Sequence, residues 1–340
     1  MSEVARILDD VRARGDAALR EWSLRLDGVE PRRAEPDADV PADAILALAA
    51  AVRRWHALQR PADVELEISP GVRLARRWLP LASVGIYVPR GLVSTLVMCV
   101  VPAQVAGVER IVVATPPSGA AAVTAAARLL GVEEVWALGG PPAIAAFAYG
   151  TESIPPVDKI VGPGGTHVRE AKLLVSREVA IDLPAGPSEV VVLAGEDADP
   201  RVAQLELAAQ AEHGPDSVCR LVGVDGDLER ALAEVERLAP EHLVLLGEGP
   251  ESLAGRVRNA GSVFVGPWSA VAAGDYATGA NHVLPTSGWA RAVGGLGLEA
   301  FLKPVTEQRL TEEGLALLRP VVEALAEVED MPAHAEAVRR

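Results

Sequence analysis

The amino-acid sequence predicts an α/β protein with two Rossmann-like but incomplete α/β/α domains, mostly parallel sheets and a small helical C-terminal tail. From residue 80 onward, short β-branched runs alternate with Ala-rich segments of helical spacing, and Gly or Pro separates them, which is typical of βαβ units. The apolar runs lack polar alternation, as strands do when helices cover both faces of their sheet. The strands predicted in this way are 110–114, 134–138, 189–193, 243–246 and 262–265.

Helices are predicted at both ends of the chain. Apolar residues recur at helical spacing over residues 4–11, and residues 45–59 form a second helical segment rich in Ala and Leu. Residues 311–340 are charged and helical in pattern, and we expect them to pack as a separate small unit. Residues 31–41 are acidic and contain Pro, which predicts a surface loop.

Composition limits the class of protein and of partner. With 340 residues, 49% hydrophobic and 23% charged, the chain is long enough for about two domains and has an ordinary globular balance. A formal net charge of −15 would repel phosphate backbones and anionic lipid surfaces. We therefore expect a small-molecule partner, with no nucleic acid and no membrane.

The cysteines and the apolar stretches favour a cytoplasmic protein. Cys99 and Cys219 are the only cysteines, which excludes a disulfide framework, and both lie in apolar runs. We interpret both as small core residues, with a nucleophile as the alternative. Charged residues within the first ten positions exclude a signal-peptide core. The charge-free stretch 91–108 contains Ser, Thr, Pro and Gln, so it predicts a buried turn and helix rather than a membrane span.

A first group of polar residues suggests a metal site. Gly214 and Pro215 should end a helix directly after His213, so that Gln210 and His213 share one face. An amide oxygen and an imidazole at this spacing can hold adjacent positions on one cation. The alternative is a polar helix end with a capping histidine.

A second group suggests acid–base chemistry. Glu241 and His242 stand side by side at the lip of an apolar strand, and the carboxyl ends of strands with the loops beside them are favoured active-site positions in α/β sheets. An ordinary surface Glu–His pair is the alternative. Residues 274–286 are too polar and too rich in Gly for regular structure, and such loops often carry function. Residues 162–167 approach a dinucleotide fingerprint but end in His, so the residues alone do not establish such a site.

The histidines are concentrated in these clusters. The chain has six, and four of them lie in polar surroundings with N and O donors rather than thiolates, which suits a catalytic zinc or a similar metal. These four are His213, His242, His282 and His334.

Seven motifs, in order along nearly the whole chain, resemble those of the histidinol dehydrogenase family. They are residues 83–89, 148–155, 157–164, 182–189, 210–217, 240–243 and 281–286. The resemblance implies oxidation of an amino alcohol, L-histidinol, through the aldehyde to L-histidine, with NAD⁺ and one zinc ion per subunit. It also implies an intertwined homodimer with shared active sites.

The resemblance assigns roles to individual residues. It makes Glu241 and His242 catalytic, with His242 as the general base and Glu241 as the group that activates water in the second step. Tyr87 is the expected cofactor contact, whereas Pro142 and Gly165 stand where the family has a Gln and an Asn that bind NAD. The expected zinc ligands, which with His242 also touch substrate, are Gln210, His213, Asp275 and His334. The further expected substrate contacts are Ser188, His282 and Glu329.

The resemblance also implies a domain plan and a shortened member of the family. We expect a first α/β domain of residues 1–85 and 191–300, a second of residues 86–190, and a helical dimerisation segment of residues 301–340. The usual N-terminal segment and part of the NAD-contact set are missing, and the chain is short between His213 and Glu241. Two alternatives stay open: a dehydrogenase paralogue for another polar alcohol, and a metal-binding paralogue without redox activity.

Overall fold

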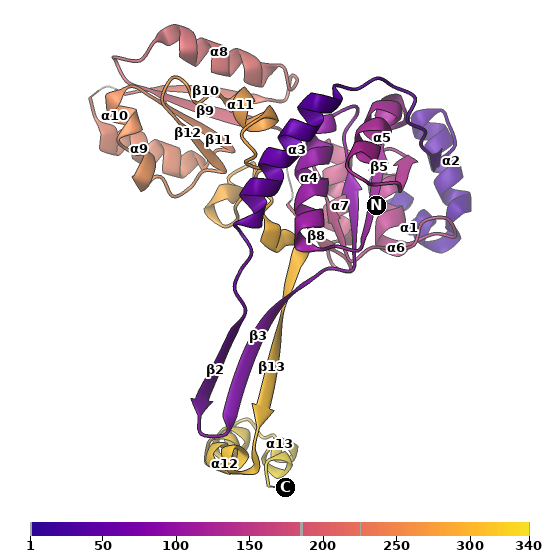
Figure 1. Ribbon diagram of the computed structural model, residues 1–340, viewed down its shortest axis with the longest axis vertical. Helices are drawn as coiled ribbons and strands as arrows, with labels where there is room; N and C mark the ends of the chain where they lie inside the picture. The colour runs from indigo at the N-terminus through magenta and orange to yellow at the C-terminus, as the bar shows by residue number, and fades with distance from the viewer. Residues whose placement is uncertain (1, 184–185, 225, 340) are drawn as a thin grey trace. The chain divides into compact units, whose positions relative to one another are not determined.

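The computed structural model describes residues 2–183, 186–224 and 226–339, and it divides into two compact units (Figure 1). Unit 1 comprises Met1–Gln59 and Leu81–Phe301, and unit 2 comprises Arg60–Pro80 and Leu302–Arg340. Among the described residues, none of the helices is both long and apolar enough to cross a membrane.

The larger sheet of unit 1 has six strands in the order β1-β6-β5-β4-β7-β8. Only the edge strand β1 is antiparallel to its neighbour, and the central strands are parallel, as the apolar runs predict. The strands are β1 Arg32–Arg33, β4 Ser83–Tyr87, β5 Arg110–Thr115, β6 Val135–Ala137, β7 Lys159–Val161 and β8 Ala180–Ile181.

Two groups of helices pack on this sheet. Helices α1, α6 and α7 contact one another, α3, α4 and α5 form the other group, and both groups contact β4. Gly85 in β4 makes the approach of α6 possible, because a Cβ there would lie 2.7 Å from the ring of Phe147. The helices are α1 Glu3–Arg14, α2 Asp16–Asp27, α3 Ala42–Ala57, α4 Val93–Ala106, α5 Ala120–Leu129, α6 Gly140–Tyr149 and α7 Thr166–Val175, with the 3₁₀ turn η1 Pro117–Gly119.

The second sheet of unit 1 is fully parallel, in the order β10-β9-β11-β12. Alternate residues of β9 enter opposite cores: Val191 and Leu193 pack with α9, while Val190 and Val192 pack with α8 and α11. The elements are β9 Glu189–Ala194, α8 Pro200–Ala211, β10 Val218–Gly223, α9 Leu228–Leu238, β11 His242–Leu246, α10 Glu248–Glu251, η2 Ala254–Arg256, β12 Ser262–Val265, α11 Val271–Tyr276, η3 Trp289–Arg291 and η4 Leu298–Phe301.

Unit 2 is a three-stranded antiparallel sheet, in the order β13-β3-β2, followed by the predicted helical tail. The side chain of Thr311 caps the first tail helix by accepting a hydrogen bond of 3.1 Å from the N–H of Gly314. The elements are β2 Val64–Ser69, β3 Val72–Pro80, β13 Leu302–Leu310, α12 Glu312–Val328 and α13 Pro332–Ala337. The fold is thus α/β with mostly parallel sheets and a helical C-terminal tail, as predicted.

Three expectations differ from the structure. Helix α1, expected in one domain with residues 191–300, packs its apolar face on α6 and α7 instead, whereas residues 42–59 contact both α4 and residues 281–298, the latter through His56 and Gln59. Residues 60–80 and 302–310 form strands in unit 2 that have no continuous apolar run to predict them. Cys99 is buried as expected, but Cys219 is exposed because β10 is an edge strand that pairs only with β9.

Candidate active site

Most of the predicted site residues line one cavity of about 290 Å³ in unit 1, here called the His242 cavity. Its walls come from the turn after β7, the start of α4, the starts of β9 and β11, the end of α11 and the segment after it. The predicted residues in its lining are Ser188, His213, Glu241, His242, Asp275 and His282.

The cavity lies at the N-terminal ends of the strands of the four-stranded sheet. Ser188 precedes β9, and His242 is the first residue of β11, where it pairs with Val190 and Ser262. The expectation that Glu241 and His242 occupy a favoured strand end therefore holds only in part, since carboxyl ends are the usual choice. The six-stranded sheet contributes from its carboxyl edge, through the turn at Pro163 and Gly164.

Glu241 is held as a buried carboxyl group. Glu241 is only 6% exposed, and its Oε2 accepts hydrogen bonds from Ser188 Oγ at 2.7 Å and from the Glu189 N–H at 2.8 Å. Those two donors favour the ionised form, but burial dominates and raises the pKa of Glu241 to about 8. At neutral pH the group is mostly protonated.

His242 is shifted in the opposite direction by the same cause. It is 4% exposed, and burial, with smaller contributions from His213 and His282, lowers its pKa to about 4. Nδ1 lies 3.0 Å from the carbonyl oxygen of Glu189, so Nδ1 carries the hydrogen and donates it. The Nε2 lone pair of a neutral imidazole is therefore available as a base.

Gln210 is buried without partners. It is 3% exposed, and among the described residues neither atom of its side-chain amide has a hydrogen-bond partner. Leaving buried polar atoms unpaired is costly, and such atoms commonly mark a site for a ligand or an ion. The helix α8 ends at Ala211, earlier than predicted, so exposed His213 lies in the following turn, with its Nδ1 3.3 Å from the carbonyl oxygen of Gln210.

Asp275 and His282 form the far wall of the cavity. Asp275 lies on the short helix α11 rather than in a loop, and burial raises its pKa to about 6 although His213 acts against that shift. Nδ1 of His282 lies 3.1 Å from the carbonyl oxygen of Asp275, and burial lowers the pKa of this imidazole to about 4. Nε2 of His282 lies 3.2 Å from Thr95 Oγ1. The sequence offered no signal for Thr95 beyond one polar residue within an apolar helix.

Glu329 and His334 belong to the other unit. Glu329 follows the last residue of α12, His334 lies in α13, and both are exposed in unit 2. Within the described ranges, no group of three or more His, Cys, Asp or Glu side chains is arranged to hold a metal ion. Of the expected metal ligands, His213 and Asp275 line the His242 cavity, whereas Gln210 is buried but does not line it.

The expected cofactor residues lie around a second cavity of about 330 Å³, here called the Tyr87 cavity. Tyr87 is 4% exposed, its Oη accepts a hydrogen bond of 3.1 Å from the Gly140 N–H, and burial raises its pKa. Gly165 is exposed at the start of α7 and lines this cavity, whereas Pro142 is buried within α6 and does not. Pro184 and Ala185 of the motif 182–189 lie outside the described residues.

The two α/β layers and the buried histidine and carboxyl groups of the His242 cavity define an α/β enzyme with an acid–base site. Comparison with known proteins refines this class. The family model for histidinol dehydrogenase matches residues 1–234 and 222–340. The chain belongs to the histidinol dehydrogenase family and is an oxidoreductase of that family.

Individual relatives agree with this assignment over the whole chain. A histidinol dehydrogenase of Methanothermobacter thermautotrophicus is 43% identical over 398 residues, covering 100% of this chain and 93% of the relative. A histidinol dehydrogenase of Yersinia pestis is 41% identical over 388 residues, covering 98% of this chain and 88% of the relative. The crystal structure of histidinol dehydrogenase from Elizabethkingia anophelis superimposes with a TM-score of 0.88 at 34% identity, covering 99% of this chain and 90% of that one.

Proposed function

We propose that this chain is a zinc- and NAD-dependent dehydrogenase that oxidises L-histidinol through L-histidinal to L-histidine, as a cytoplasmic enzyme of histidine biosynthesis. Family membership supports the reaction. The observation that carries the proposal is the His242 cavity, which is lined by a buried neutral imidazole and a buried protonated carboxyl group, those of His242 and Glu241.

Zinc fits the donors present in unit 1. The unpartnered amide of Gln210, the imidazole of His213 and the carboxylate of Asp275 are N and O donors of the kind that hold catalytic zinc, and His334 is the proposed fourth ligand. When bound, the ion would fix the amine and imidazole nitrogens of the substrate. One zinc ion per subunit is therefore proposed.

His242 is the proposed general base of the first oxidation. Because its imidazole is neutral at pH 7 and Nδ1 is occupied by the Glu189 carbonyl oxygen, Nε2 can take the hydroxyl proton as hydride leaves for the nicotinamide. Glu241 is the proposed base of the second oxidation, where it would deprotonate the water that attacks the aldehyde. Since burial raises the pKa of Glu241 to about 8, this second step should accelerate as the pH rises toward that value.

Three further side chains are proposed to contact substrate. Ser188 Oγ donates to Glu241, which leaves its lone pairs free to accept a hydrogen bond from a substrate amine. His282 presents a neutral imidazole in the same cavity. Glu329, from the tail, is the third proposed substrate contact.

NAD is proposed to lie along the Tyr87 cavity with a reduced set of contacts. Pro142 and Gly165 lack the side-chain amides that the family supplies, and two lost hydrogen bonds would weaken binding roughly 5- to 150-fold. This loss is a specific reason to keep a second candidate, a metal-binding paralogue without redox activity.

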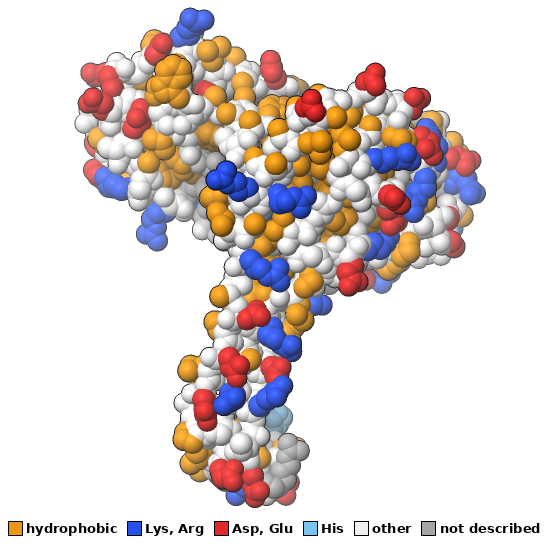
Figure 2. All heavy atoms as spheres, in the orientation of Figure 1, with side chains coloured by type: hydrophobic (Ala, Val, Ile, Leu, Met, Phe, Trp, Pro, Cys, Tyr) orange, Lys and Arg blue, Asp and Glu red, His pale blue; other side chains and the backbone are white. Residues whose placement is uncertain are grey.

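A homodimer with shared active sites is proposed, with residues 301–340 as the dimerisation segment that brings Glu329 and His334 to the partner's site. Helix α12 supports this because it leaves a row of large apolar side chains exposed at helical spacing. Figure 2 shows hydrophobic side chains on the visible face of unit 2. The exposed row consists of Leu317, Val321, Leu325 and Val328.

NADH formation from L-histidinol, measured with chelated and with zinc-reconstituted protein, tests the proposal. We expect turnover only with zinc. His213→Ala should weaken zinc affinity by at least the roughly 10- to 100-fold that is typical of losing a residue that only hydrogen-bonds to a metal ligand. Glu212→Ala, a neighbouring exposed position, is the matched control and should retain wild-type zinc. Zinc content without turnover at millimolar NAD⁺ would favour the non-redox paralogue.

A further inference from the structure

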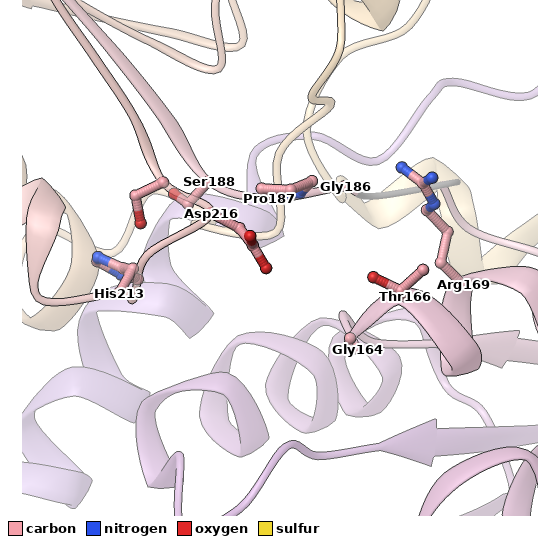
Figure 3. A pocket seen from close by; sticks show the side chains of 10 residues that line it. Gly164, Thr166, Arg169, Gly186, Pro187, Ser188, His213 and Asp216 are labelled. Atoms are coloured by element: carbon pink, nitrogen blue, oxygen red, sulfur yellow. The ribbon is translucent and has the colours of Figure 1, made fainter.

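A smaller cavity of about 180 Å³, here called the Arg169 cavity, lies between the two cavities described above (Figure 3). It shares Gly164, Gly186, Ser188 and His213 with the His242 cavity. It also shares Gly165 and Thr166 with the Tyr87 cavity. The three cavities are therefore adjacent, with walls shared around the start of α7.

Arg169 is the only Lys or Arg that lines the Arg169 cavity within the described part of the chain. Its side chain rises from α7 toward the Gly186 segment in Figure 3, and Nη1 lies 2.8 Å from the place that a Cβ on Gly186 would occupy. The absence of a side chain at position 186 thus leaves room for the guanidinium group. Arg169 is half-buried.

In the described part of the chain, the guanidinium group of Arg169 has no protein partner to neutralise it. Among residues 2–183, 186–224 and 226–339, no hydrogen bond, ion pair or ring contact involves this group. Many other arginines of this acidic chain are paired with carboxylates, including Arg12, Arg14 and Arg110. A half-buried cation that stays unpaired in a chain of net charge −15 is suited to an anionic ligand.

We infer that Arg169 binds the pyrophosphate of the dinucleotide cofactor, an inference that rests on the proposed function. A dinucleotide with its nicotinamide in the His242 cavity and its adenosine half toward Tyr87 must place its two phosphates in the connecting cavity. The planar fork of arginine matches phosphate oxygens, and the N-terminal end of α7 on the same wall acts in the same direction. Arg169 thereby compensates for the amides missing at Pro142 and Gly165.

Asp216 limits the affinity of this subsite for an anion and offers a second position at which to test it. Its carboxylate lines the same cavity from the turn after α8 and points into the gap opposite Thr166 in Figure 3. A carboxylate on the wall disfavours an anion there, so Asp216→Asn should tighten pyrophosphate binding while Arg169→Gln weakens it.

Calorimetric titration with ADP-ribose, adenosine, inorganic pyrophosphate and L-histidine tests the inference. Relative to wild type, Arg169→Gln should weaken the binding of ADP-ribose and raise the KM for NAD⁺, each about 10- to 100-fold. The affinity for adenosine and the KM for histidinol should stay unchanged. Arg169→Lys keeps the charge but loses the planar fork, so its affinity for ADP-ribose should lie between those of wild type and Arg169→Gln. Arg177→Gln removes the same charge at an exposed position beyond α7 and should match wild type.

Several results would overturn the inference. The first is that wild type does not bind ADP-ribose, and the second is that wild type and Arg169→Gln bind it with equal affinity. The third is that Arg169→Gln loses affinity for L-histidine alone, which would assign Arg169 to the product carboxylate. If Arg169→Gln loses adenosine binding together with ADP-ribose binding, the variant has a folding defect. Arg169→Lys then decides the question, because recovery of ADP-ribose binding alone would support the inference. If ADP-ribose binding depends on Arg169 while histidinol is not oxidised, the subsite stands and the proposed reaction fails.

Discussion

Glu241 and His242 are adjacent residues whose pKa values move in opposite directions for one physical reason. Burial disfavours the charged form of each group, which raises the pKa of the carboxyl to about 8 and lowers that of the imidazole to about 4. Both groups are therefore neutral at pH 7. A pair at the surface would have kept ordinary values, so that at pH 7 the carboxyl would be ionised and the imidazole only partly protonated.

This arrangement predicts a pH-dependent stability of the metal-free protein. Between about 4.5 and 8 the folded state keeps a proton on Glu241 that the unfolded state has lost, so stability falls as the pH rises through that window. His242 acts oppositely, but only between about 4 and 6.5. From pH 6.5 to 8, wild type should lose up to about 2 kcal/mol of unfolding free energy that Glu241→Gln does not lose.

Urea unfolding of chelated protein at pH 6.5 and pH 8.0 measures the difference. Glu196→Gln removes a carboxylate at an exposed loop position and should follow the wild-type pH dependence. An unchanged pH dependence in Glu241→Gln would mean that this carboxyl group is not the one that titrates.

At the scale of elements, helix α7 is fastened to the turn after β7 by a buried ion pair. Lys172 pairs with Asp182, and their side chains are 3% and 1% exposed. Lys172 Nζ also donates to the Gly162 carbonyl oxygen at 2.8 Å, while Asp182 Oδ2 accepts from the Gly162 N–H at 2.6 Å. Gly162 has a φ of 107°, a conformation that favours glycine. The pair thus fixes the turn between the three cavities.

Removing one member should be far more costly than removing both. Lys172→Met leaves the Asp182 carboxylate buried without its cation, so we expect a loss of about 3–5 kcal/mol in unfolding free energy. Lys172→Met combined with Asp182→Asn should recover part of that loss. Chemical denaturation measures both, with Lys303→Met as the exposed control. Equal destabilisation by the single and the double variant would contradict a buried charge penalty.

At the scale of the whole molecule, the proposed site draws on both compact units. Unit 1 holds Gln210, His213 and Asp275, whereas Glu329 and His334 belong to unit 2. A tail with an exposed apolar row has surface to bury against a second copy of the chain. The proposal of shared active sites follows from these facts together with the family.

Subunit exchange between two inactive variants tests that proposal. If His334 serves the partner's site, mixed dimers of His242→Ala and His334→Ala regain one intact site. A random mixture should then recover about a quarter of wild-type activity. Each variant alone is the control and should stay inactive. A mixture that stays inactive although heterodimers form would show that the tail serves its own subunit.

Local sequence patterns were sufficient for much of the fold, and the family resemblance selected the candidate site residues. Apolar runs such as 110–114 and 243–246 predicted buried parallel strands, because residues covered on both faces must be apolar throughout. The resemblance selected Glu241, His242 and Asp275, and all three line one cavity. The strands of unit 2 escaped prediction because most of their side chains are exposed and charged residues interrupt any apolar run.

The sequence by itself determined the mostly parallel α/β class and the helical tail, since these depend on local periodicity, and its resemblance to the family selected the candidate site residues. Only the tertiary structure decided that the cavity lies at the N-terminal ends of β9 and β11, that Thr95 contacts His282, and that edge-strand Cys219 is exposed. It also decided the opposite pKa shifts of Glu241 and His242. Burial and through-space contacts arise from segments far apart in the chain, so no local pattern records them.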